Sequence, residues 1–183
     1  MASDSLKLVP LFLLTFFSCQ LLIAKGCDAL IQTLCSKTEE PVLCKDCFNR
    51  NPESKTADAK GLVLISIQCG EYDAELLHNY TFNLWENTPE SKTELKQVLD
   101  TCSSQTLLGH DSFRGATVAV EEGVFDWRGY AIDQITREVA PFLNRCLEVF
   151  KEHPQLAVPQ YILAGTVSVN QDIAIILGIL KNI

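Results

Sequence analysis

The chain is poor in basic residues and lacks the patterns on which several classes of protein depend. It has 15 lysines and arginines against 23 aspartates and glutamates, a formal charge of −8, and no run of basic residues. Binding to a phosphate backbone requires a positive patch, so nucleic acid is excluded as a partner. No stretch shows sustained alternation of polar and apolar residues between turn signals, so no β-sheet is expected.

Catalytic and metal-binding motifs are also lacking. The three histidines, His78, His110 and His153, lie in different segments, and none belongs to a His-Glu-x-x-His motif. Residues 109–113 place His, Asp and Ser in sequence, but consecutive helical residues point around the axis and form no relay. No nucleophile elbow, phosphate-binding loop or dinucleotide fingerprint is present. The chain is therefore not expected to be an enzyme, nor to hold a metal or a cofactor.

The only hydrophobic run of its length stands at the N-terminus. Residues 8–24, LVPLFLLTFFSCQLLIA, follow Lys7, and small residues occupy positions −3 and −1 of a cut before Cys27. This arrangement is typical of a secretory signal peptide. A membrane anchor is the alternative because the run approaches spanning length, but its N-terminal place and polar interruptions favour cleavage. Residues 1–26 are therefore predicted to be removed, which leaves a secreted chain without membrane attachment.

The mature chain keeps 13 basic and 22 acidic residues, a formal charge of −9. Helical periodicity runs through most of it, since apolar or small residues recur in steps of three and four along four segments. The four stripes are Leu62, Ile65, Cys69, Tyr72, Leu76, Tyr80 and Leu84; Leu95, Leu99, Cys102, Thr106, Gly109, Phe113, Ala116 and Val120; Ile132, Ile135, Val139, Phe142, Cys146 and Val149; and Val169, Ile173, Ile176, Leu180 and Ile183.

The breaks between these helices are short, with turn-like sequences at 86–94, 121–126 and 152–159. Short loops force consecutive helices to run antiparallel. The expected fold is all-α, an up-down-up-down antiparallel four-helix bundle over 55–183 preceded by a short helical hairpin over 27–54. Together they form one domain long enough to bury a hydrophobic core.

Seven cysteines follow the predicted cleavage point, and secretion places them where cysteines pair. Residues equidistant from the turn of an antiparallel hairpin face each other. The short loop near 123–124 joins two antiparallel helices. Cys102 lies about 21 residues before this turn and Cys146 about 22 residues after it, so the two face each other. Cys35 and Cys44 flank a midpoint within the polar turn of the N-terminal hairpin. Both pairs are therefore predicted to be disulfides that staple the fold.

Cys27, Cys47 and Cys69 have no partner by this mirror test. Cys69 is expected to be a buried free thiol, while a Cys27–Cys47 bond stays open because the N-terminal piece can bend. Cys44 and Cys47 also form a C-x-x-C pair. They lack the strand-to-helix setting of a redox motif and the second ligand pair of a zinc site, so no redox or metal role is expected.

Two features suit a role at the surface. Asn79-Tyr80-Thr81 is the only N-glycosylation sequon, and Asn79 stands one helical step off the buried stripe, so it is a candidate glycosylation site. The loop EEGVFDWRG (121–129) gathers aromatic and arginine residues, which interfaces favour. Alternatively, Phe125 and Trp127 fold over the end of the bundle as a lid. The candidate interface residues are Phe125, Asp126, Trp127 and Arg128.

Several stretches resemble the plant invertase and pectin methylesterase inhibitor family. Residues 35–44 read CSKTEEPVLC, similar to the family's pattern of Cys, Thr, an acidic or aromatic residue, Pro and Cys. Residues 51–67 read NPESKTADAKGLVLISI, similar to its Asp-Pro-x-Ser-x-x-x-Asp-x-x-Gly-Leu stretch. Cys102 in VLDTC and Cys146 in FLNRCLEVF complete the framework, and the resemblance covers 27–183.

The resemblance implies a helical hairpin before a four-helix bundle, the disulfides Cys35–Cys44 and Cys102–Cys146, and no catalytic residues. It also implies an apoplastic or cell-wall inhibitor that blocks the active-site cleft of a carbohydrate-active enzyme. In the family, pectin methylesterase inhibitors lay helices across the substrate groove, whereas invertase inhibitors insert a Pro-Lys-Phe loop. No Pro-Lys-Phe occurs in this chain. Pectin methylesterase is therefore the predicted target, with acid invertase, or a non-inhibitory secreted binding protein such as a lipid carrier, as alternatives.

Overall fold

The computed structural model describes residues 28–123 and 125–183. The predicted signal peptide and Cys27 lie outside the described residues. Within these ranges the chain is helical, without a strand, as the sequence predicted. After a helical stretch over 28–35, the elements are α2 (Pro41–Arg50), the 3-10 helix η1 (Pro52–Lys55), α3 (Ala59–Asn87), α4 (Thr93–Glu122), α5 (Trp127–Asp133), the π-helical segment η2 (Gln134–Val139), α6 (Ala140–Glu152) and α7 (Gln160–Lys181).

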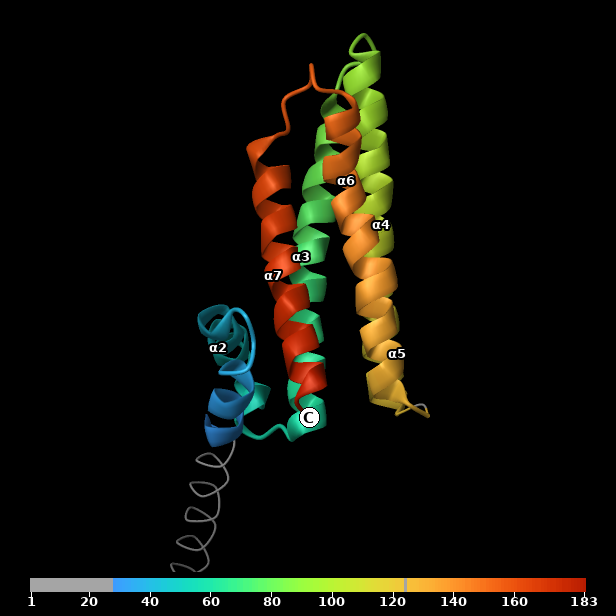
Figure 1. The fold of residues 1–183 in the computed structure, drawn as a ribbon. Coiled ribbons are helices and arrows are strands. Elements are labelled where there is room, and N and C mark those ends of the chain that lie inside the picture. The colour runs from blue at the N-terminus through green and yellow to red at the C-terminus, as the bar shows by residue number, and fades with distance from the viewer. Residues whose placement is uncertain (1–27, 124) are drawn as a thin grey trace, which may run out of the picture.

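The long helices form the expected up-down-up-down bundle (Figure 1). α3 and α4 are antiparallel neighbours, α5, η2 and α6 follow one another along a single rod that packs on α4, and α7 returns beside α3. The turn between α4 and α5 and the C-terminal end of α7 lie at the same end of the bundle. The predicted fold class is therefore confirmed.

The NPESKTAD stretch sets the passage from the hairpin into the bundle. The Asn51 side chain accepts a hydrogen bond from the Glu53 backbone N–H (3.0 Å) and caps η1. The buried Ser54 hydroxyl donates to the Phe48 carbonyl (2.7 Å). The Asp58 side chain then accepts from the Gly61 backbone N–H (2.8 Å) and caps α3. These side chains satisfy backbone groups that helix ends leave unpaired, so the motif directs where α3 begins.

Two of the predicted stripes, those of α4 and α7, are buried as expected except at their end residues Leu95 and Ile183, which are partly buried. The stripe predicted on α3 is wrong at Tyr72 and Leu76, which are exposed. The buried positions of this part of α3 are Gly70, Ala74, Leu77 and Thr81. α3 packs against α4 on one side and α7 on the other, so its buried face lies between these two contacts. The predicted stripe lies toward the α7 side of this face, where some of its residues are exposed.

The third bundle helix departs from α-helical spacing at η2. A π-helical turn holds more residues than an α-helical turn, so Ile135, Val139 and Leu143 are buried in successive steps of four. Phe142, which the α-helical pattern predicted, is only partly buried. The π-helical segment thus shifts the buried stripe by one residue.

Three disulfides join cysteines within residues 28–123 and 125–183. Cys35–Cys44 and Cys102–Cys146, the two pairs predicted, have Cα–Cα distances of 5.5 and 4.4 Å. The third bond joins Cys47 to Cys69 with a Cα–Cα distance of 6.1 Å. The expected free thiol at Cys69 is therefore wrong, and so is the alternative Cys27–Cys47 bond. The mirror test compares positions within one hairpin, whereas α2 packs against α3 and brings Cys47 to Cys69.

Removing this third bond should loosen the hairpin. The bond closes a sequence separation of 22 residues, for which the chain-entropy account gives about 3 kcal/mol of stabilisation. We expect the Cys47→Ala, Cys69→Ala double variant of the mature chain to lose about this much in urea unfolding, with faster hydrogen exchange confined to the hairpin. A wild-type chain whose peptide map shows Cys47 as a free thiol would contradict the pairing.

The hairpin covers one half of the outer flank of α3 and α7, as Figure 1 shows for α2. Ile175 and Ile179 of α7 are buried in the same cluster as Leu34 and Phe48 of the hairpin. A Cβ on Gly178 would lie 3.1 Å from the Thr38 Cα, so the glycine permits close approach of the two backbones. α7 has the length and hydropathy of a membrane span, but its stripe lies in the bundle core.

Candidate functional site

The loop between α4 and α5 is built on two residues in the left-handed backbone region. Gly123 ends α4 with φ 62°, and Asp126 adopts φ 56°. Glycine adopts such angles without strain, and aspartate tolerates them better than most residues. The Asp126 side chain also accepts a hydrogen bond from the Gly129 backbone N–H (3.2 Å) and caps α5. The Asp126 cap therefore fixes where α5 begins.

Trp127 and Arg128 anchor this turn to the bundle. Trp127 is partly buried against the main core cluster, and the Lys60 ammonium lies 6.0 Å from the centre of its ring. The Arg128 guanidinium donates to the backbone carbonyl of Ile183 (2.6 Å), at the end of α7. These contacts match the lid alternative for Trp127. Both residues therefore support the loop more than they offer a free surface.

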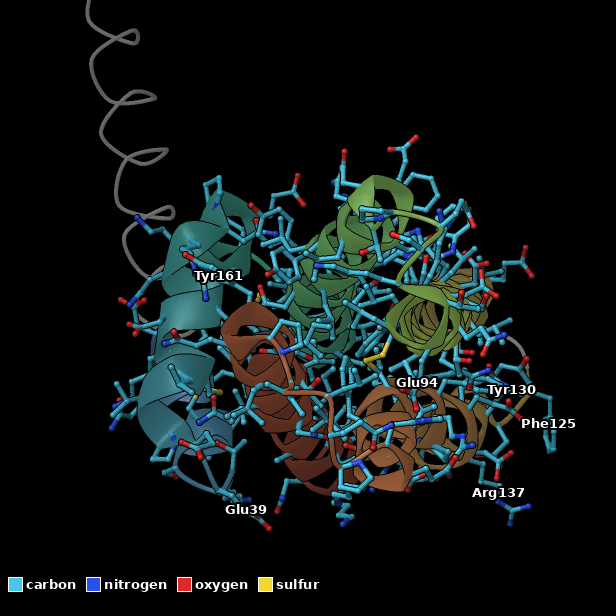
Figure 2. The ribbon with its side chains drawn as sticks, turned by 90° about the horizontal axis from the view of Figure 1, so that it is seen from above. Glu39, Glu94, Phe125, Tyr130, Arg137 and Tyr161 are labelled. Carbon is cyan, nitrogen blue, oxygen red and sulfur yellow. A yellow bond between two sulfur atoms is a disulfide. The ribbon has the colours of Figure 1, made fainter. Side chains whose placement is uncertain are left out.

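Phe125 projects into solvent with a relative exposure of 103%. Figure 2 shows it at the edge of the molecule, with Tyr130 on the same side. Tyr130 is 47% exposed and did not stand out in the sequence, because it is simply a residue off the buried stripe of its helix. The four predicted interface residues thus divide into one protruding ring, one capping carboxylate and two anchors.

The remaining candidate residues lie apart from this loop. Asn79 is exposed on α3, as glycosylation requires, and its modification stays a prediction. The His78 ring nitrogen lies 3.1 Å from the Ser103 carbonyl, His153 pairs with Glu94 at 2.8 Å, and His110 is 3.8 Å from Glu71. In the part of the chain that the structure describes, no group of three His, Cys, Asp or Glu residues is placed to hold a metal.

A second feature, which the sequence did not indicate, is an open depression of about 730 Å³ where the hairpin meets α3 and α7. Asp73 and Asp172 face each other within it. Asp73 accepts a hydrogen bond from the Ser168 hydroxyl (2.6 Å), and the buried Oδ2 of Asp172 receives none. The lining residues are Cys47, Arg50, Asn51, Pro52, Glu53, Ile65, Gln68, Cys69, Tyr72, Asp73 and Asp172.

The pKa of Asp172 is raised to about 7, chiefly because the carboxyl group is buried. The negative charge of Asp73 and its hydrogen bond to Asp172 contribute to this rise, while the positive charge of Arg50 opposes it. Two carboxyl groups in contact in a poorly solvated place cannot both ionise readily. At acidic pH the pair therefore holds one proton between α3 and α7.

The described residues define a small, disulfide-stapled helical-bundle protein whose loop presents a protruding aromatic ring, a residue type that binding interfaces favour. The chain belongs to the family described as plant invertase/pectin methylesterase inhibitor, whose profile matches residues 29–179. It is therefore an inhibitor that acts by binding an enzyme, as the sequence predicted.

The known proteins that are similar to this chain include one curated relative and one solved structure. One is "Cell wall / vacuolar inhibitor of fructosidase 2" of Arabidopsis thaliana, 29% identical over 182 residues, which cover 99% of this chain and 98% of the relative. The other is the crystal structure of a pectin methylesterase inhibitor from Arabidopsis thaliana, with a TM-score of 0.59 and 13% identity over 84% of this chain and 95% of that one. At this identity the second likeness supports the fold alone.

Proposed function

We propose that this chain is a secreted, non-catalytic inhibitor of an acid invertase, a fructosidase, in the apoplast. The observation that carries the proposal is the anchored loop with its exposed Phe125, on a chain similar along its whole length to an inhibitor of fructosidase. Anchoring the residues that follow Phe125 reduces the conformational entropy that binding costs. An exposed aromatic ring is a favoured anchor for a partner's pocket.

The proposed inhibition is steric. The Phe125 ring enters the substrate cleft of the enzyme, while Asp126 and Arg128 hold the turn in shape through the Gly129 N–H and the Ile183 carbonyl. The chain needs no reactive group for this, because occupancy of the cleft excludes the sugar. Pectin methylesterase remains a second candidate target, since the Pro-Lys-Phe sequence of invertase inhibitors is absent from the chain.

A side-by-side titration tests the target. The purified, oxidised mature chain is added to an acid invertase assay and to a pectin methylesterase assay, each with several isoforms. Inhibition of invertase alone supports the proposal, and inhibition of pectin methylesterase alone moves the assignment to the second candidate. Failure to inhibit any isoform of either enzyme would refute the inhibitory function.

Truncating the loop's ring should weaken inhibition without affecting the fold. Because Phe125 is fully exposed, Phe125→Ala should leave the melting temperature unchanged. It should raise the inhibition constant by about tenfold to a hundredfold, the range of an interface hot spot. Leu108→Ala, at an exposed leucine of α4, is the control and should inhibit like the wild type. Equal inhibition by both variants would exclude the loop as the inhibitory element.

A further inference from the structure

The outer flank of α3 and α7 continues beyond the part that the hairpin covers (Figure 1). On the covered part, Ile175 is 2% exposed, and Cys69 is bonded to Cys47 of α2. Tyr72 and Leu76 follow Cys69 along the same side of α3 at helical spacing. On α7, Gln171 donates a hydrogen bond to Glu40 of the hairpin (3.4 Å), and Val167 and Tyr161 precede it along the helix. The same flank is thus packed by a helical element at one end and left open at the other.

The open part is apolar and rich in tyrosine. Relative exposures are 55% for Tyr72, 50% for Leu76, 70% for Tyr161 and 52% for Val167. Tyr80 joins the two helices, since its ring centre lies 5.2 Å from that of Tyr161. Figure 2, seen along the bundle, shows Tyr161 on the side of α7 where the hairpin lies. We call these five residues the tyrosine face.

The depression lined by Asp73 and Asp172 adjoins the end of the tyrosine face that is next to the hairpin. Tyr72 belongs to both, and Arg50, Glu53, Asp73 and Asp172 also line the depression. The charges of Arg50 and Glu53 are opposite, and Asp172 holds a proton at acidic pH, so Asp73 leaves this corner with a negative charge. The hairpin and the face thus form two sides of a notch with an acidic corner.

We propose that the tyrosine face and its acidic corner are a second contact of this inhibitor with its target enzyme, at a segment with a lysine or arginine beside apolar side chains. The proposal rests on the proposed inhibitory function. Tyrosine is enriched among residues that dominate interface energies. A cationic side chain would reach Asp73 at the corner, and apolar neighbours would cover Leu76 and Tyr161.

The position of the notch favours a large partner over a second copy of this chain. α7 has 22 residues, about 33 Å at the rise of an α-helix. Tyr161 stands at its start, whereas Arg128 ties the Phe125 loop to Ile183 beyond its end. A partner that touches both must extend along most of the bundle, as an enzyme can. Two copies with a formal charge of −8 each would repel one another.

The apolar half of the contact is tested with inhibition constants against the enzyme that the wild type inhibits. Tyr161→Ala and Leu76→Ala should each raise the inhibition constant by about tenfold, and Tyr161→Phe should restore most of the loss because the ring remains. Leu108→Ala is the matched control for Leu76→Ala, since it removes a leucine of similar exposure (43%) on α4. Melting temperatures should stay at the wild-type value for all four variants.

The charged half is tested by salt. Asp73→Asn keeps an oxygen that accepts from Ser168, but it removes the charge. It should weaken inhibition and make it less sensitive to added salt, whereas Asp100→Asn on the surface of α4 should match the wild type. Wild-type inhibition by Tyr161→Ala, Leu76→Ala and Asp73→Asn would overturn the second contact and leave the inhibitory function standing. Sedimentation showing a wild-type dimer that Tyr161→Ala dissociates would also overturn it.

Discussion

Replacement of both Cys102 and Cys146 by alanine is expected to lower the free energy of unfolding by about 4 kcal/mol, the value that the chain-entropy account gives for this loop. The bond spans 44 residues, the longest separation among the three disulfides of the described chain. Both cysteines are fully buried within a cluster of α4, α6 and α7 that includes Leu99 and Phe150. Truncation therefore also removes packing there.

The measurement is urea unfolding of the mature chain, followed by circular dichroism. The Cys35→Ala, Cys44→Ala variant is the comparison, because its bond spans only nine residues and should contribute about 2.5 kcal/mol by the same account. Hydrogen exchange should rise along α4 and α6 in the first variant and in the hairpin in the second. An equal or smaller loss from the 102–146 pair would contradict the loop-length account for this protein.

The bundle and this staple could be predicted because both depend on repetition along the chain. The α4 stripe runs from Leu99 to Val120 without interruption and is buried throughout. Short breaks then fix the direction of the next helix, which places Cys146 opposite Cys102. In a long amphipathic helix many residues follow the same apolar spacing, so one residue that departs from it does not alter the predicted helix or its buried side.

The misplaced residues are those whose environment depends on a neighbour distant in sequence or on an irregular helical turn. Tyr72 and Leu76 continue an apolar spacing on α3, yet no neighbouring element covers them and they are exposed. Leu143 replaces Phe142 in the core because of the π-helical turn before it. Cys69 found its partner in α2, outside any hairpin that contains it. Periodicity within one helix carries no information about these three outcomes.

The loop at 121–129 stays a predicted interface, and the contacts of its residues could not be predicted from the sequence. The sequence shows an aromatic-rich turn between two helices. The role of each side chain in this turn depends on its contacts with other parts of the fold, which the sequence does not give. Trp127 meets the core, and Arg128 meets the end of α7. Phe125 meets neither and stays exposed. The Asp73–Asp172 pair was not foreseen, because its members are 99 positions apart and meet only where α3 and α7 pack.

The Asp73–Asp172 pair is expected to lower the free energy of unfolding as the pH rises. The pKa of Asp172 is about 7 in the folded chain against an ordinary value of 3.8. Between these values the folded chain holds a proton that the unfolded chain has released. The unfolded chain then binds fewer protons, so the free energy of unfolding falls as the pH increases.

The stabilisation is complete below about pH 4 and is lost as the pH passes through about 7, the pKa of folded Asp172. At 1.36 kcal/mol for each pKa unit, its upper bound is about 4 kcal/mol. Asp172→Asn removes the titrating group and keeps the shape of the side chain. We expect this variant to be more stable than the wild type at pH 7.5, with a flatter dependence of stability on pH between 4 and 7.

Urea unfolding of the mature wild type, Asp172→Asn and Asp100→Asn at half-unit steps from pH 4 to 8 checks this expectation. The Asp100→Asn control on exposed α4 carries the same change in net charge and should follow the wild-type curve. Because Asp172 lies between α3, α7 and Arg50 of the hairpin, hydrogen exchange above pH 7 should rise first along this seam. Parallel pH curves for wild type and Asp172→Asn would show that the pair is not protonated in the folded chain.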